Sequence, residues 1–142
     1  MLKIVRSPDI YIKDTGEERG RGAFAARNFG PGELVEIAPV LLLSTPRSEM
    51  EEELRRRTFN WGNLGGNDKG SEAISFGYGS MYNQANPSNL RYAADNQQLA
   101  IVFTAVRAIT EHEELTINYN ADGGGHTWPD DTWFSRNDIV PL

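Results

Sequence analysis

The central stretch of the chain, residues 77–89, combines hydrogen-bonding side chains with residues that shape loops. Asn83, Asn86 and Asn89 each carry an amide that can donate and accept hydrogen bonds. Two glycines in the stretch permit close approach of the backbone to a ligand, and Pro87 stiffens its exit. The composition of the stretch is compatible with an ordinary turn of a β protein and, equally, with a binding loop.

The chain of 142 residues is long enough to bury a core, and we expect a single domain spanning residues 1–142. It contains no cysteine, which excludes disulfide frameworks, cysteine-based zinc sites and thiol nucleophiles. Its formal net charge of −6 argues against direct nucleic-acid binding and favours a partner that carries positive charge. Because we find neither a signal peptide nor a membrane-spanning stretch, we predict a cytoplasmic protein without membrane contact.

The pattern of apolar and polar residues predicts a mainly β fold, a β-rich α+β arrangement of many short strands. The strand expected within residues 98–109 is apolar on both faces, so we predict that it is buried on both sides. One helix is expected over residues 46–57, because acidic residues lie toward its N-terminus and basic residues at its C-terminus, as the helix dipole favours. This helix opens an insert of helix and loop, residues 45–72. The absence of alternating strands and helices disfavours a Rossmann-type nucleotide fold.

Two segments near the start and one near the end accompany the central loop. Residues 19–24 contain a Gly-x-Gly turn, and residues 30–35 contain a Pro-Gly-Glu pattern. The central loop supplies Asn-Gln-Ala with a trailing Pro and Asn, and residues 113–119 read Glu-Glu-Leu-Thr-Ile-Asn-Tyr. In this order and at these separations, the segments resemble the SET domain of protein lysine methyltransferases, in its minimal form without zinc-binding flanking segments. The resemblance covers a core of about residues 20–120.

This resemblance implies a fold of several short sheets with one insert helix, in which the last motif threads past the central loop like a pseudoknot. It also implies S-adenosylmethionine as the methyl donor and a lysine side-chain amine, in a basic protein or peptide, as the acceptor. Methyl transfer needs a neutral amine aligned behind the methyl group. That task calls for positioning, desolvation and oriented oxygen atoms, and it requires no metal.

The resemblance also implies roles for individual residues. Tyr119 is the expected catalytic residue, with its hydroxyl at the point where the methyl group and the amine meet. We expect the Asn83 amide to bind the donor's ammonium and backbone groups at Gln84 to bind its adenine. The full cofactor-binding set is Gly20, Arg21, Gly22, Ala23, Asn83, Gln84, Tyr119 and Trp133. The expected substrate channel contains Tyr78, Tyr82 and Phe134.

Each of these residues also has a purely structural alternative. Tyr119 could be a core residue that ends a strand, and Asn83 and the two glycines could be turn formers. Tyr78 and Tyr82 could be packing residues. These alternatives stay open on the sequence.

Two positions depart from the family pattern, since Gln84 stands where the family has His and Ala85 where it has Ser. Glutamine can replace some hydrogen bonds of histidine but not its charge or its shape. The alternative function is therefore a catalytically impaired SET-like module that binds cofactor or a basic peptide without methylating it.

The C-terminal tail, residues 121–142, is rich in aromatic residues. Trp128, Trp133 and Phe134 are the candidates for closing the site, and pairing of two chains into a homodimer is a further expectation. His126 stands among acidic residues in a glycine-rich segment, which is more typical of a solvated loop than of a metal centre. We therefore expect no metal site.

Overall fold

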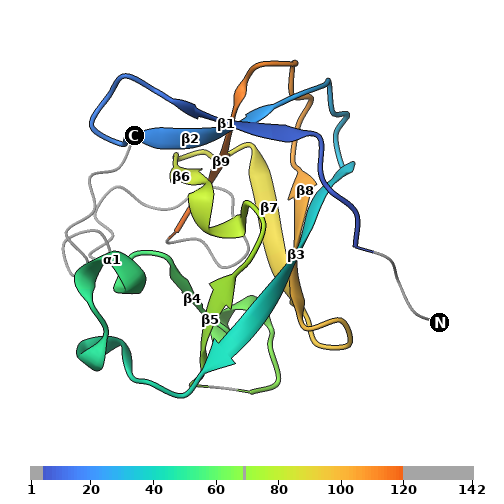
Figure 1. Ribbon diagram of the computed structural model, residues 1–142. Helices are drawn as coiled ribbons and strands as arrows, with labels where there is room; N and C mark the ends of the chain where they lie inside the picture. Colours follow the sequence, from blue (N-terminus) through green and yellow to red (C-terminus); the bar gives the residue numbers. More distant parts are fainter. Residues whose placement is uncertain (1–4, 69, 120–142) are drawn as a thin grey trace.

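The computed structural model describes residues 5–68 and 70–119, which form two β-sheets linked by turns and irregular segments (Figure 1). The five-stranded sheet is antiparallel throughout. Its strands, in spatial order, are β4 (Thr58–Asn60), β5 (Glu72–Ser75), β3 (Leu34–Leu43), β8 (Ala100–Ala105) and β7 (Leu90–Asp95). The mainly β architecture expected from the sequence is confirmed.

The four-stranded sheet joins segments that lie far apart in the sequence. Its order is β1 (Ile10–Asp14), β2 (Arg21–Ala25), β9 (Glu114–Ile117) and β6 (Asn83–Gln84). β9 pairs antiparallel with β2 and parallel with the short β6. The end of the described chain is thus inserted between an early strand and the central loop, which brings the three sequence motifs together.

The core lies mainly between the two sheets and is filled by apolar strand residues, among them Ile101 and Phe103 of β8, both fully buried. Burying such apolar side chains supplies the main driving force for folding. Val102 and Thr104 of the same strand are only half-buried. One face of β8 is therefore fully covered and the other only in part, whereas the sequence predicted burial on both faces.

The helix predicted over residues 46–57 is not continuous, and this prediction was wrong. A 3₁₀ turn (Arg47–Glu49) and a four-residue helix α1 (Glu52–Arg55) replace it, and neither has a side-chain cap. Between them the backbone of Met50 is extended and its side chain is buried. Tertiary anchoring explains the break, because Arg47 donates hydrogen bonds to Thr58 Oγ1 and to the Arg55 carbonyl instead of extending a helix.

Two more 3₁₀ turns complete the described elements, Gly62–Leu64 and Gly79–Met81. The second leads directly into β6, so it fixes the direction from which the central loop enters the sheet. No helix among the described residues is long and apolar enough to cross a membrane.

Candidate cofactor and active site

The side chain of Asn83 links the three motifs at the junction of β2, β6 and β9. Its amide nitrogen donates to the Arg21 carbonyl at 3.0 Å and to Glu114 Oε2 at 2.8 Å. Because a carbonyl and a carboxylate both accept from the nitrogen, the amide can adopt only one orientation. No hydrogen bond to its oxygen is formed within the described part of the chain. The Asn83 oxygen is therefore a fixed acceptor available for a donor group of a ligand.

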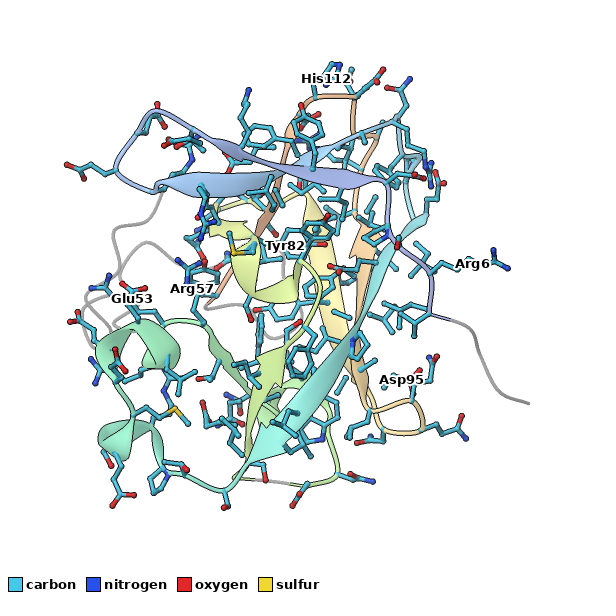
Figure 2. All side chains as sticks on the ribbon, viewed as in Figure 1. Arg6, Glu53, Arg57, Tyr82, Asp95 and His112 are labelled. Atoms are coloured by element: carbon cyan, nitrogen blue, oxygen red, sulfur yellow. The ribbon has the colours of Figure 1, made fainter. Side chains whose placement is uncertain are left out.

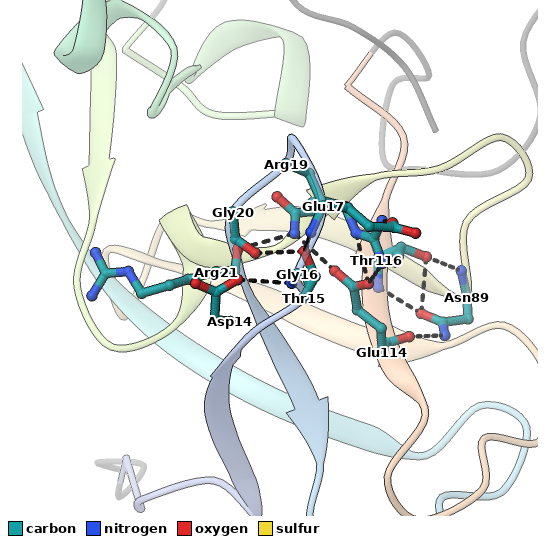
Figure 3. A network of polar contacts seen from close by, with 11 residues as sticks. Asp14, Thr15, Gly16, Glu17, Arg19, Gly20, Arg21, Asn89, Glu114 and Thr116 are labelled. Atoms are coloured by element: carbon teal, nitrogen blue, oxygen red, sulfur yellow. Dashed lines mark hydrogen bonds and ion pairs between the residues drawn. The ribbon is translucent and has the colours of Figure 1, made fainter.

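The carboxylate of Glu114 is the electrostatic centre of this junction (Figure 3). Its side chain is 12% exposed, and its Oε1 accepts from Nε and Nη2 of Arg19 at 3.0 and 2.8 Å. Arg19 also pairs with Glu17. A charge-assisted hydrogen bond of this kind is stronger than a neutral one. The Arg19–Glu114 pair therefore holds the acceptor that orients Asn83.

Gly22 lies where a larger residue would not fit. A β-carbon at this position would stand 2.5 Å from Glu114 Oε2 and 3.0 Å from the Asn83 amide nitrogen. Gly20, just before β2, has a φ of +72°, a left-handed conformation that glycine adopts without steric cost. The two glycines together let the backbone of residues 20–23 turn tightly and approach the Asn83 amide.

The hydroxyl of Tyr119 donates a hydrogen bond to the Tyr82 carbonyl at 2.8 Å. Burial raises the pKa of Tyr119 to about 12. The charge of Glu114 also acts to raise this pKa, whereas that of Arg57 acts to lower it. The phenol therefore keeps its proton at neutral pH. Tyr119 is suited to orienting a neighbouring group, not to accepting a proton.

The side chain of Gln84 ties the central loop to the chain segment that carries Tyr119. Its Oε1 accepts from the Tyr119 backbone N–H at 2.6 Å, and its Nε2 donates to Asn118 Oδ1 at 3.3 Å. Gln84 is 3% exposed and Asn118 is fully buried. Hydrogen bonds to buried groups are costly to lose. Gln84 therefore acts as a clamp across the junction.

Asn89 forms a second clamp along β9 (Figure 3). Its amide nitrogen donates to the Glu114 carbonyl at 2.8 Å, and its oxygen accepts from the Thr116 N–H at 2.8 Å. The amide thus pairs with the strand backbone much as a neighbouring strand would. Asn83 and Asn89 therefore have different roles. The Asn83 amide bonds to β2 and Glu114, whereas the Asn89 amide bonds to the backbone of β9.

The remaining predicted site residues occupy different surroundings. Arg21 is exposed, and its backbone carbonyl accepts the hydrogen bond from the Asn83 amide. Ala23 is fully buried, so only its backbone can face a ligand. Tyr78 is half-buried and packs against the core. Tyr82 is 1% exposed, so its burial does not favour the predicted role of its ring in a substrate channel. At the site, Tyr82 contributes its backbone carbonyl.

Trp133 and Phe134, with their predicted roles, and the candidate Trp128 are outside the part of the chain that the structure describes. His126 and its acidic neighbours lie outside them as well. Within residues 5–68 and 70–119 no group of three or more potential metal ligands is found. The expected absence of a metal stays a prediction.

Three polar residues of the site have no role assigned to them by the sequence. Arg19 and Glu114 lie within the quoted segments, but only the pairing of β2 with β9 brings them together. Glu36 stands alone among apolar residues of β3, which is a weak signal for a buried and specifically bonded carboxylate.

Comparison with known proteins identifies the family. The SET domain family model matches residues 20–120. The chain is 32% identical over 143 residues to the histone-lysine N-methyltransferase of Schizosaccharomyces pombe described as H3 lysine-37 specific, covering 99% of this chain and 89% of that protein. The fold is similar to the crystal structure of a candidate histone methyltransferase of Plasmodium falciparum, with a TM-score of 0.62 and 22% identity over 87% of this chain and 98% of the other.

The family match spans the two glycines, the central loop and Tyr119, which are the residues that the fold gathers at one junction. The resemblance expected from the sequence is thereby confirmed. The chain belongs to the SET domain family of protein lysine methyltransferases.

Proposed function

We propose that this protein transfers methyl groups from S-adenosylmethionine to a lysine side chain of a histone or a similarly basic protein. The observation that carries the proposal is the junction itself, where the Asn83 side chain bonds to β2 beside Gly22 and the Tyr119 hydroxyl bonds to the carbonyl of Tyr82, the residue before Asn83. The similarity to a histone-lysine methyltransferase over nearly the whole chain supports the same activity.

The residues at the junction fit S-adenosylmethionine. The fixed Asn83 oxygen matches the donor's ammonium, which offers only hydrogen-bond donors. The absence of a side chain at Gly22 lets the Glu114 carboxylate and the Asn83 amide lie against the backbone of β2, which keeps the Asn83 oxygen in its fixed position. When bound, the cofactor supplies an electrophilic methyl group on a sulfonium centre.

The chain's own contribution to the reaction is positioning. The amine of the substrate lysine must arrive neutral, because only its free electron pair can form the new bond to carbon. Tyr119 keeps its proton and donates it to the Tyr82 carbonyl, so toward the amine its oxygen acts as an orienting acceptor and not as a base. Gln84 holds the Tyr119 backbone in place for this task.

Gln84 also bears on the alternative of a catalytically impaired module. In this chain glutamine provides both an acceptor for Tyr119 N–H and a donor to Asn118, so the departure from histidine leaves the junction hydrogen-bonded. This arrangement favours an active enzyme over a binding module.

Incubation of the purified protein with radiolabelled S-adenosylmethionine and histone H3 tests the proposed activity. We expect label on histone H3, removed when lysine residues of the histone are chemically acetylated. Ribosomal proteins and naked nucleic acid serve as comparison substrates. Donor binding without label on any basic protein would instead support the impaired module.

Replacing Gly22 with alanine is expected to weaken donor binding by roughly tenfold or more and to lower the folding stability measurably. The new β-carbon meets the Glu114 carboxylate, which must shift away from its bonds with Arg19 and Asn83, so the Asn83 amide loses the partner that orients it. Calorimetric titration with S-adenosylmethionine measures the affinity, and thermal unfolding measures the stability. Gly30→Ala is the matched control, because a β-carbon there meets nothing closer than 3.9 Å. Equal affinities for the two variants would contradict a donor site at Gly22.

Three finer parts of the proposal concern the class of substrate, the cellular location and the oligomeric state. The net charge of −6 supports a basic protein substrate rather than nucleic acid. A cytoplasmic location and a homodimer stay predictions, to be tested by cell fractionation and by sedimentation of the purified chain.

A further inference from the structure

A buried carboxylate, Glu36 of β3, lies outside the cofactor junction. It is 3% exposed, and its neighbour Val35 is 5% exposed, so two successive residues of one strand face the interior. The pairing of β3 with β8 shifts register between Leu34 and Glu36. An irregularity of this kind re-aims a side chain that ordinary strand alternation would turn to the other face.

The segment that leads into the central loop closes over this carboxylate. The Tyr82 hydroxyl donates to Glu36 Oε1 at 2.5 Å, and the Tyr78 N–H donates to Oε2 at 2.8 Å. Gly77 has a φ of +67°, and a β-carbon there would stand 2.5 Å from Oε2. Residues 77–82 are therefore shaped around Glu36.

Burial disfavours the charged form of the Glu36 carboxylate. Burial raises its pKa above the ordinary value of 4.5, although the bonds from Tyr82 and Tyr78 act to lower it. Within the described chain it forms no ion pair. Since the folded pKa is raised, the contribution of Glu36 to stability is most favourable below the ordinary pKa and is lost as the pH rises through the folded pKa. The two hydrogen bonds from residues 77–82 therefore offset part of the cost of burying the carboxylate and tie it to this segment.

Tyr82 connects Glu36 to the active site. Its hydroxyl is held by Glu36, its ring packs against Phe103 with 4.7 Å between ring centroids, and its carbonyl accepts the Tyr119 hydroxyl. Figure 2 places Tyr82 in the interior, near the middle of the molecule. A displacement of the Tyr82 side chain would therefore move the acceptor that sets the direction of the Tyr119 hydroxyl.

We propose that Glu36 is a positioning residue for methyl transfer, which acts through Tyr82 on the orientation of the Tyr119 hydroxyl. This inference rests on the proposed function for its kinetic consequences. Its structural content, a mechanical link from Glu36 to Tyr119, does not depend on activity.

Glu36→Gln tests the inference while keeping the size of the side chain. We expect kcat to fall about tenfold, since small misplacements of a reacting group reduce rates by up to about 100-fold. The Kd for S-adenosylmethionine is expected to stay within twofold of the wild-type value, and the Tm is expected to stay close to the wild-type value because the change keeps the volume of the side chain and one acceptor oxygen. Glu72→Gln is the matched control, because Glu72 is equally buried but is bonded to Arg47 and Thr58. It should lower the Tm and leave kcat unchanged.

Combining Glu36→Gln with Tyr82→Phe tests whether the two residues act as a unit. Glu36→Gln replaces the charge-assisted hydrogen bond to Tyr82 with a neutral one, and Tyr82→Phe removes that bond altogether, so the double variant should be no slower than the slower single variant. The inference would be overturned if the fold-reduction in kcat of the double variant equalled the product of the two single reductions. It would also be overturned if Glu36→Gln had the wild-type kcat.

A spectroscopic measurement separates this inference from the proposed function. With tyrosine labelled with ¹³C at Cζ, the five tyrosines of the chain are assigned by single Phe substitutions. In Glu36→Gln the Tyr82 and Tyr119 resonances should move, and that of Tyr11, in β1, should not. An unmoved Tyr119 resonance overturns the link even in an active enzyme. A moved resonance supports it even if the wild-type protein methylates no substrate, in which case only the proposed function fails.

Discussion

Tyr119→Phe is expected to lower kcat by roughly 100-fold, because removal of one preorganised hydroxyl at a reacting centre typically costs that much. The fold should survive, since the neutral hydrogen bond from the hydroxyl to the Tyr82 carbonyl is worth only about 1 kcal/mol. Initial rates of label transfer at saturating donor measure kcat, and thermal unfolding checks the fold. Mass spectrometry of the product detects any change in the number of methyl groups added.

The pH dependence of the same reaction distinguishes orientation from proton transfer. Burial raises the pKa of Tyr119 to about 12, so the phenol stays protonated throughout the range in which the enzyme is assayed. The rate should rise with pH as the substrate amine loses its proton, and this rise should persist in Tyr119→Phe at a lower overall level. A rising limb that disappears in the variant would make Tyr119 a general base and contradict the orienting role.

Tyr11→Phe is the matched control for the loss of a hydroxyl. The Tyr11 hydroxyl is bonded to His112 Nδ1 at the turn before β9, away from the Tyr119 hydroxyl. It should leave kcat and the product distribution unchanged. An equal loss of activity in both variants, or none in Tyr119→Phe, would remove Tyr119 from the catalytic centre.

The sequence predicted the parts of the site that lie within short motifs. Asn83, Gly22 and Tyr119 belong to segments whose residue types and order are informative by themselves, and the fold brings these segments together. Glu114 and Arg19 meet only because β9 is inserted beside β2, a pairing between segments about ninety residues apart. No local pattern specifies such a partner, since sheet pairing depends on the whole fold.

Glu36 and the insert illustrate two different limits of local reasoning. The orientation of Glu36 depends on a register shift against β8, which is a property of the pair of strands and not of β3 alone. In the insert, residues 46–57 have the charge pattern of a helix, yet the burial of Met50 and the contacts of Arg47 interrupt it. Helix propensity is a weak preference that tertiary contacts override.

The second large effect is expected at Gln84. Gln84→Ala removes the acceptor used by Tyr119 N–H and the donor to Asn118 Oδ1 in a buried setting, which should destabilise the fold by about 1–3 kcal/mol. The segment that carries Tyr119 then loses a restraint next to the reacting centre, so kcat should fall by roughly tenfold or more at temperatures where the variant is folded. Chemical denaturation and label transfer measure the two quantities.

Gln84→His tests whether the hydrogen bonds to Tyr119 and Asn118 matter or whether glutamine itself is required at this position. A neutral imidazole offers one acceptor and one donor, so it can keep one or both of the bonds to Tyr119 and Asn118 that alanine loses. We expect its kcat to lie well above that of Gln84→Ala. Gln98→Ala is the control, because Gln98 is bonded to Asp95 at the turn between β7 and β8. Suppose instead that Gln84→His methylates the substrate and the wild-type protein shows no detectable methylation. Gln84 would then be the cause of the missing activity, and the function of the wild-type chain would be that of the impaired binding module.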